Sequence, residues 1–481
     1  MRSQAMFFRA RSGEKLADRL LQRNLATVRN RFVDARAAAI ARYEGDFEAL
    51  RDAGQEIRDR VLGNLDVWLE TFEERARSTG AEVLYARDGE EICAIVADIA
   101  RRHGATRAVK SKSMLSEEAD LNHALASAGV EPVETDLGEY IQQIDGNEPP
   151  SHILAPAFHK SKEQIAALFA RTHGRPLKHD IAELTREARE VLRAHFISAQ
   201  MGISGGNFLV AETGSVALVT NEGNGRMVTT LPKVHVVITG IEKIVPTLED
   251  LATMLRLLPR SASGQDISNY VSLLTGVKRE HDTDGPEHMY FILVDNGRAG
   301  LVGTAFQDML RCIRCSACMN HCPVYQSVGG HAYGWVYPGP MGSVLTPLYT
   351  GIGNALDLPQ ASTLCNQCGS VCPVRIPLPD LLRRLREEQV DMGLRPRGER
   401  WALRLWAWVA ARPVLYRVAS AIGVRYLNWL ADGTDRIRVM GIAPEWTAER
   451  DLPAPEGRTF RELYRHRSRQ GSGNGHSKRA S

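Results

Sequence analysis

Two cysteine-rich segments constrain this chain more than any other feature of its sequence. The first, CIRCSACMNHCPV, covers residues 312–324, and the second, STLCNQCGSVCPV, covers residues 362–374. Seven of the eight cysteines lie between positions 312 and 372. Such clustering is typical of thiolate ligands to a metal, whereas a disulfide framework would be spread over the fold.

The spacing of the first segment indicates which metal group it binds. Cys312-x2-Cys315-x2-Cys318-x3-Cys322-Pro is the frame in which bacterial ferredoxins hold [4Fe-4S] clusters. Spacings of two residues let three thiolates of one tight loop reach three irons. A zinc site is the alternative, but zinc ligands normally come in pairs and stop at four. The spacing therefore predicts iron–sulfur chemistry.

In two-cluster ferredoxins the fourth cysteine of each segment crosses to the other cluster. This rule gives two ligand sets: Cys312, Cys315, Cys318 and Cys372 for the first cluster, and Cys322, Cys365 and Cys368 for the second. Superposing the two segments places Ser362 where the second set lacks a cysteine. The first cluster is predicted to be [4Fe-4S], and the second [4Fe-4S] or [3Fe-4S]. Serine, water or a partner could supply its fourth ligand; alternatively Ser362 is only a loop hydroxyl or helix cap.

The remaining cysteine and the nearby histidines are given structural interpretations. Cys93 lies in an apolar helical stretch and is predicted to be a buried small hydrophobe. His321 and His331 follow no ligand spacing, so they are predicted to be polar surface residues.

The composition is that of a soluble globular protein of two or three domains. A formal net charge of +3 gives no strong general attraction to nucleic acid or membrane. Residues 315–356 carry no charged side chain, but several Gly and Pro residues would break a membrane helix there. Residues 401–430 are apolar, yet arginine recurs every five to eight positions, which favours amphipathic helices. With no signal peptide evident at the N-terminus, a cytoplasmic location is predicted.

Periodicity predicts helices at both ends of the chain and an α/β region between them. Apolar residues recur at helical spacing through about residue 75. Beyond it, β-rich runs and helical stretches such as 89–104 and 116–129 alternate, which predicts an α/β fold with a largely parallel sheet. The predicted β-rich runs are 82–86, 107–111, 131–136, 152–158, 207–213, 215–220, 234–245 and 290–297.

Several motifs together resemble a known family. AVKSKSMLSEE (108–118), LRLLPRSASGQ (255–265), YFILVDNGR (290–298), the two cysteine segments and GRTFRELYRHR (457–467) closely resemble the LutB/YkgF family. The densest part of the resemblance is 202–250, and it covers nearly the whole length. Members of that family also carry three cysteines in the second segment.

The resemblance implies a fold and a set of partners. A LUD domain, related to the NagB/RpiA/CoA-transferase-like α/β fold, would precede an α-helical two-cluster ferredoxin domain. The partners would be LutA-like and LutC-like proteins of a lactate utilisation system. The expected organisation is a helical region (1–75), the LUD domain (76–298), the dicluster domain (300–395), a helical region (396–470) and a disordered tail (471–481).

Glycine-rich loops in the α/β region suggest a binding site for phosphate or carboxylate. Lys112 in the sequence SKS and Arg226 in NEGNGR are the candidate anion ligands, predicted to face one pocket at the strand ends. Turns that merely join short strands explain each glycine equally well. Glu212 stands where CoA-transferase-like folds place a nucleophilic glutamate, but fold analogy alone does not establish that role.

The function that the resemblance implies is electron transfer through two clusters during oxidation of L-lactate to pyruvate. No G-x-G-x-x-G flavin fingerprint opens a βαβ unit, so the chain is predicted to be a non-catalytic component of a larger complex. The alternative is a CoA- or nucleotide-dependent transferase whose clusters are structural. A nucleic-acid-binding iron–sulfur protein has only the basic C-terminal tail in its favour.

Overall fold

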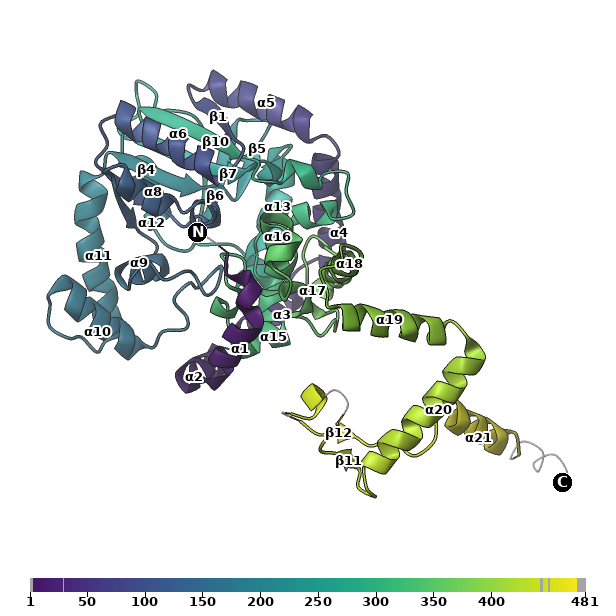
Figure 1. The fold of residues 1–481 in the computed structure, drawn as a ribbon. Coiled ribbons are helices and arrows are strands. Elements are labelled where there is room, and N and C mark those ends of the chain that lie inside the picture. The colour runs from purple at the N-terminus through teal and green to yellow at the C-terminus, as the bar shows by residue number, and fades with distance from the viewer. Residues whose placement is uncertain (1–2, 29, 442–443, 449, 474–481) are drawn as a thin grey trace, which may run out of the picture. The chain divides into compact units, whose positions relative to one another are not determined.

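A six-stranded sheet forms the centre of the α/β region in the computed structural model, which describes residues 3–28, 30–441, 444–448 and 450–473 (Figure 1). All neighbouring strands are parallel. In order across the sheet they are β1 (Glu82–Ala86), β10 (His288–Val294), β7 (Val234–Gly240), β4 (Met201–Gly205), β2 (Arg107–Lys110) and β3 (Glu131–Glu134). The predicted α/β fold with a parallel sheet is confirmed.

The two faces of this sheet have separate cores because successive side chains of a strand point to opposite sides. Tyr290 and Ile292 of β10 pack against α6 (Gly89–Arg102) and α8 (Leu121–Ser127). Phe291 packs on the other face against Phe72 of α5 (Leu65–Ser78), with ring centroids 5.1 Å apart. Covered on both faces, β7 and β10 are apolar along most of their length, as parallel strands are expected to be.

A smaller mixed sheet and further helices complete the α/β region. The second sheet has the order β8 (Ile244–Val245), β5 (Phe208–Val210), β6 (Ser215–Thr220) and β9 (Tyr270–Leu274). The other helices are α7 (Met114–Glu118), α9 (Leu137–Ile144), α10 (Lys162–His173), α11 (Ile181–Ser198), α12 (Asn224–Thr230) and α13 (Leu248–Ala262). The helical run predicted at 116–129 is interrupted at Asp120, whose φ of 58° ends α7.

One predicted strand is wrong. Residues 152–158 form turns, because the His152 side chain organises the backbone locally. Its Nδ1 accepts hydrogen bonds from the N–H groups of Leu154 (2.9 Å) and Ala155 (3.3 Å). Because the His152 side chain accepts from these N–H groups, they are not available to pair with a neighbouring strand.

Each cysteine segment combines loops with a four-residue helix. The region shares one hydrophobic core with the N-terminal helices and with the second sheet. This core contains Ala5, Phe208, Cys322 and Tyr333. The N-terminal helices are α1 (Phe8–Ala17), α2 (Arg19–Val28), α3 (Arg31–Ala41) and α4 (Phe47–Leu62); those of the cysteine region are α14 (Ala317–Asn320), α15 (Pro323–Val328), α16 (Gly339–Thr350), α17 (Gln367–Ser370) and α18 (Leu378–Asp391). The shared core explains why Met1–Asp391 forms one compact unit.

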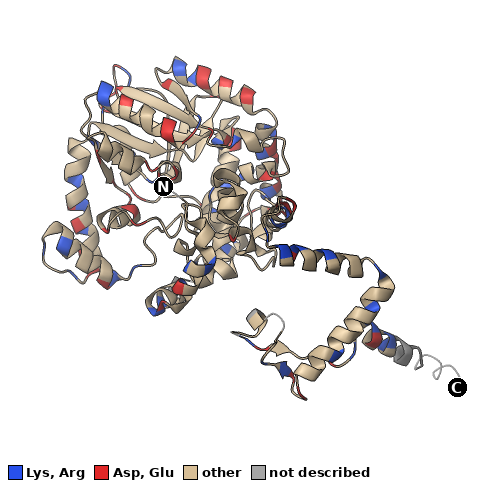
Figure 2. Ribbon diagram, in the orientation of Figure 1, with Lys and Arg blue, Asp and Glu red and all other residues tan. Residues whose placement is uncertain are grey.

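The described residues of the second unit, Met392–Ser481, form helices and a two-stranded antiparallel pair. Its elements are α19 (Arg397–Ala410), α20 (Pro413–Leu430), β11 (Arg436–Ile437), β12 (Leu452–Pro453) and α21 (Phe460–Gly473). Helix α21 includes the first three residues of the tail predicted to be disordered; 474–481 lie outside the described residues. Figure 2 marks arginines along α19 and α20, whereas α16 is tan throughout. Among the residues that the structure describes, no helix is both long and apolar enough to cross a membrane.

Candidate metal centres

The two cysteine segments share one backbone frame. Arg314 and Ser316 have φ values of 59° and 66°, and the residues fifty positions later, Leu364 and Asn366, have 54° and 66°. Non-glycine residues rarely adopt this left-handed conformation, so its repetition at matching positions is specific. Helices α14 and α17 then begin at equivalent points. The frame therefore places Ser362 at the position that corresponds to Cys312.

Four thiols line one small cavity. They come from both segments: Cys312, Cys315, Cys318 and Cys372. Burial raises the pKa of Cys315 to about 12 and that of Cys372 to about 11, and it raises the pKa of Cys318 well above its usual range. Neighbouring thiols of the same group raise the pKa of each of these three thiols further.

This chemistry fits an iron–sulfur cluster. Buried thiols with raised pKa values would stay protonated by themselves, but a coordinating metal displaces the proton. Backbone N–H groups point at the sulfurs: Ile376 N donates to Cys372 Sγ at 3.3 Å, and Ala317 N donates to Cys315. Such bonds stabilise thiolate and tune a cluster's potential.

Cations surround this first thiol group. Arg51 of α4 donates to the Cys372 carbonyl through Nε (3.1 Å) and Nη2 (2.8 Å). Arg36 donates to the neighbouring Val371 carbonyl at 3.1 Å. Arg314 lies in the wall of the thiol cavity itself. These side chains offset the negative charge that four thiolates bring into a buried site.

The second thiol group contains Cys322, Cys365 and Cys368. Burial, and after it the thiols of Cys322 and Cys365, raise the pKa of Cys368 to about 12. Cys365 is exposed, and hydrogen bonds from Gln367 N and the Thr363 side chain lower its pKa. The second group is thus more open to solvent than the first.

Ser362 makes loop contacts within this region. Its Oγ accepts a hydrogen bond from Leu364 N at 3.1 Å, and its carbonyl accepts one from Arg386 Nη2 at 3.1 Å. These contacts correspond to the loop-hydroxyl interpretation of Ser362. The two thiol groups are neighbours, because helix α14, which carries Cys318, contacts helix α17, which carries Cys368.

Cys93 lies apart from both groups. It is half-buried in α6, and its Sγ lies 3.3 Å from the Ala119 carbonyl oxygen.

A larger cavity of about 380 Å³ opens at the carboxyl ends of β2, β4 and β7. Lys112 lines it, but Arg226 does not. Arg226 lies in α12, where its guanidinium stacks on the Tyr270 ring 4.8 Å away and Nε contacts Ser272 Oγ at 3.4 Å. The structure therefore does not bring the two predicted anion ligands together. Glu212 is also outside the cavity lining: its carboxylate accepts from Leu248 N at the start of α13.

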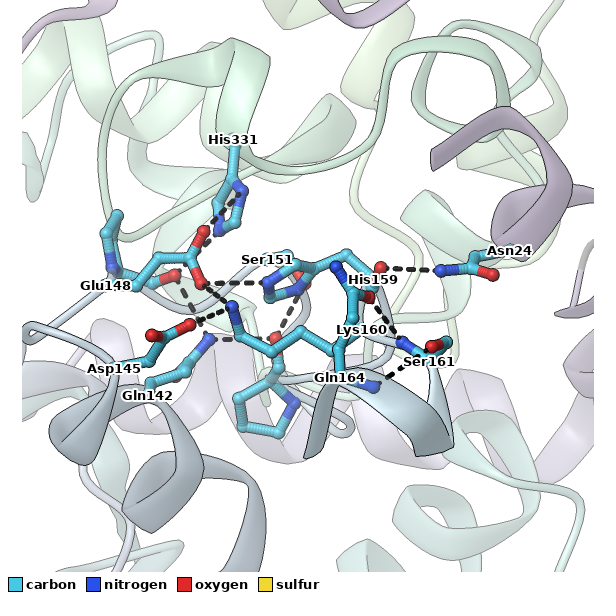
Figure 3. Close-up of polar contacts among 12 residues, drawn as sticks. Asn24, Gln142, Asp145, Glu148, Ser151, His159, Lys160, Ser161, Gln164 and His331 are labelled. Atoms are coloured by element: carbon cyan, nitrogen blue, oxygen red, sulfur yellow. Dashed lines mark hydrogen bonds and ion pairs between the residues drawn. The ribbon is translucent and has the colours of Figure 1, made fainter. Parts of the chain in front are cut away.

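A polar cluster that the sequence did not reveal joins the 145–160 loop to the cysteine region. Figure 3 shows Glu148 contacting His159, His331 and Lys160, at 3.0, 3.7 and 2.6 Å. The potential ligand atoms of the two histidines and Glu148 lie within 4.8 Å of one another. However, the Lys160 ammonium already occupies the cation position, bridging Glu148 and Asp145 (2.7 Å). The cluster is therefore a salt-bridge network.

His331 in this network is mostly buried, so its predicted surface position is wrong. Its Nε2 donates to the Pro149 carbonyl at 2.8 Å, which fixes the ring between the loop and the cysteine region. Burial, followed by the nearby His159, lowers the pKa of His331 to about 4.

Acidification should weaken the fold through His331. Its pKa is about 6.5 in the unfolded chain, so the stability it contributes is present above that pH and is lost as the pH falls toward 4. Between pH 7 and pH 5 we expect His331 to account for a loss of about 2 kcal/mol. His331→Gln, which keeps a donor for Pro149, should lose about 2 kcal/mol less than the wild type over this interval, since the buried His152 and His235, whose pKa values are also lowered, contribute equally in both proteins. Anaerobic denaturant titrations of both proteins test this; equal losses would contradict it.

Comparison with known proteins agrees with this architecture. The LUD domain family matches residues 69–294, the 4Fe-4S dicluster domain matches 308–376, and the C-terminal region of lactate utilisation protein B matches 384–469. The parallel sheet and the paired thiol groups thus define an iron–sulfur protein in which a LUD domain precedes a dicluster ferredoxin-type domain.

Full-length relatives give the particular family. Lactate utilization protein B from Bacillus pumilus is 42% identical over 98% of this chain and 99% of its own length. Lactate utilization protein B from Lysinibacillus sphaericus is 42% identical over 96% of this chain and 97% of its own length. An uncharacterized electron transport protein, YkgF of Escherichia coli, is 40% identical over 97% of this chain and 98% of its own length. The chain belongs to the lactate utilisation protein B family.

Proposed function

We propose that this protein is an electron-transfer subunit of a system that oxidises L-lactate to pyruvate. The observation that carries the proposal is the pair of adjacent thiol groups built on one repeated backbone frame. The names of the relatives, lactate utilization protein B and electron transport protein, support the substrate and the role.

Each residue of the two groups has a defined part in this proposal. Cys312, Cys315, Cys318 and Cys372 hold a [4Fe-4S] cluster, while Cys322, Cys365 and Cys368 hold a second cluster that is [4Fe-4S] or [3Fe-4S]. Bound clusters supply one-electron redox chemistry. The protein's own contribution is to bury the first group, place cations beside it and donate backbone hydrogen bonds to its sulfurs. The partners would be LutA-like and LutC-like proteins of the same system.

The isolated protein should not oxidise lactate. No G-x-G-x-x-G flavin fingerprint opens a βαβ unit in the sequence, and the first thiol group is enclosed by protein side chains. Anaerobic protein with full iron content should reduce no dye when L-lactate is added, although dithionite should reduce its clusters. With the partner proteins present, L-lactate should produce the EPR signals of reduced clusters.

Two results would count against the proposal. Lactate-dependent dye reduction by the isolated, flavin-free protein would make it the dehydrogenase itself. Acyl transfer to or from CoA without any change in the cluster spectra would favour the transferase interpretation.

A further inference from the structure

The cavity at the carboxyl ends of the parallel strands has the position and size of a small-molecule site. Strand β4 ends at Gly205, β7 ends at Gly240, and Lys112 follows β2 by two residues; all three line the cavity. Open parallel sheets bind ligands at this edge. A volume of about 380 Å³ also lies in the range typical of such sites.

The polar part of this cavity contains a cation without a hydrogen-bond partner. The Lys112 Nζ is buried and has no hydrogen-bond partner within the described part of the chain. Glu139 and Glu222 lie near enough to interact electrostatically with Lys112, but burial raises the pKa of both carboxyls, which reduces the charge that they offer it. A buried ammonium that lacks a hydrogen bond is costly, so an anionic partner is expected to come from outside the protein.

The acids of the cavity wall do not supply that partner. Asp136 accepts from the N–H groups of Gly138 (3.1 Å) and Glu139 (3.4 Å), and so caps α9. Glu222 accepts from Leu137 N at 3.4 Å. Burial and the nearby Asp136 raise the pKa of Glu222 to about 7, which reduces its negative charge at neutral pH.

Two other cations of the wall, Arg298 and Arg314, are already paired with acids. Arg298 lies 3.1 Å from Glu118 and 2.9 Å from Glu242. Arg314 lies 3.7 Å from the same Glu242. Lys243 also lines the cavity, but its Nζ donates to the Cys312 carbonyl at 3.4 Å. Lys112 is therefore the cation best placed to receive an anionic group.

Part of the remaining wall is apolar. Phe32 of α3, Ile153 and Leu258 of α13 all line it. A lactate-sized molecule would leave much of this surface uncovered, whereas a carboxylate with an apolar body would bury it. Burial of apolar surface contributes favourably in proportion to its area.

Arg314 is a residue that connects the cavity with the first thiol group. Arg314 lines both the cavity and the space enclosed by Cys312, Cys315, Cys318 and Cys372. Its guanidinium lies over the Tyr337 ring, 4.7 Å from the centroid, and Tyr337 also lines the cavity. A ligand in the cavity would therefore alter the surroundings of a charged neighbour of the first thiol group.

We propose that this cavity binds an organic carboxylate with an apolar body, whose carboxylate pairs with Lys112 and whose presence is felt at the first cluster through Arg314. This goes beyond electron transfer, which requires no ligand in the α/β domain.

Calorimetric titration of the anaerobic, cluster-loaded protein tests the proposal, with phenylpyruvate as the probe. Phenylpyruvate should bind at a single site, more tightly than pyruvate, and its uncharged methyl ester should bind much more weakly. Lys112→Met should weaken phenylpyruvate binding by at least about tenfold, the effect of losing one charge-assisted hydrogen bond. Arg226→Met, outside the cavity, should bind as wild type does. Phenylpyruvate should also shift the EPR spectrum of the first cluster.

The controls separate recognition from folding. Lys112→Arg keeps the charge and should retain much of the affinity; iron content and the thermal midpoint show whether each variant is folded. If Lys112→Met does not fold, the comparison of acid and ester on the wild-type protein decides. Absence of saturable binding by phenylpyruvate, or equal binding of acid and ester, would overturn the proposal. Binding is measured without lactate oxidation. A failure of the carboxylate-binding proposal would therefore leave the proposed electron-transfer function untouched.

Discussion

Cys372→Ala should damage the first cluster, although Cys372 belongs to the second cysteine segment. Its thiol lines the same cavity as Cys312, Cys315 and Cys318, and Arg51 of α4 holds its carbonyl. Without it, the three remaining thiols would leave one iron unligated inside a buried, cation-lined site. Iron content of anaerobic protein should fall from about eight atoms per chain, at least by the one iron that is left without a thiolate. The EPR signal of one reduced [4Fe-4S] cluster should disappear.

Two matched variants show whether this loss is specific. Cys365→Ala should damage the other cluster, because Cys365 lies with Cys322 and Cys368. Cys93→Ala, which alters a half-buried cysteine of α6, should keep full iron content. If Cys372→Ala and Cys365→Ala abolished the same EPR signal, the crossed assignment of ligands would be wrong.

Spacing and the crossing rule were the basis for the predicted cysteine sets, and the structure gathers the four thiols of the first set around one cavity. Three thiolates in a tight loop need short, fixed intervals, and those intervals are visible in the sequence. The parallel sheet was predictable for a similar reason: strands such as β7 are apolar along nearly their whole length.

The sequence failed where long-range contacts decide the outcome. His331 follows no local pattern, yet the 145–160 loop buries it against Glu148. Residues 152–158 have strand-forming composition, but the His152 side chain binds two backbone N–H groups of that segment. Arg226 was expected in a loop, and its place in α12 directs it to Tyr270. Arg314 lines both the thiol cavity and the cavity at the strand ends. Its position in the sequence, between Cys312 and Cys315, was the signal that could have indicated this.

Cluster stability in air should differ between the two sites. The first thiol group is mostly buried among cations, whereas the second includes the exposed Cys365 and has only three cysteines. We therefore expect the second cluster to be the more oxygen-sensitive and to lose its fourth iron in isolated, oxidised protein. A [3Fe-4S]⁺ EPR signal, converted to [4Fe-4S] by ferrous iron and reductant, would report that loss.

Ser362→Cys should suppress that signal and lower the potential of the second cluster. The two segments have left-handed residues at matching positions: Arg314 matches Leu364, and Ser316 matches Asn366. Residue 362 therefore corresponds to Cys312, which is a predicted ligand in the first segment. A hydroxyl there is a poor ligand because its high intrinsic pKa keeps it protonated, and Ser362 Oγ accepts from Leu364 N instead. A thiol would deprotonate on iron and add one negative charge, which makes reduction less favourable. Ser362→Ala is the control and should behave as wild type. Should wild-type protein already keep eight irons in air, with Ser362→Ala indistinguishable from it, another group supplies the fourth ligand and Ser362 is only a loop residue.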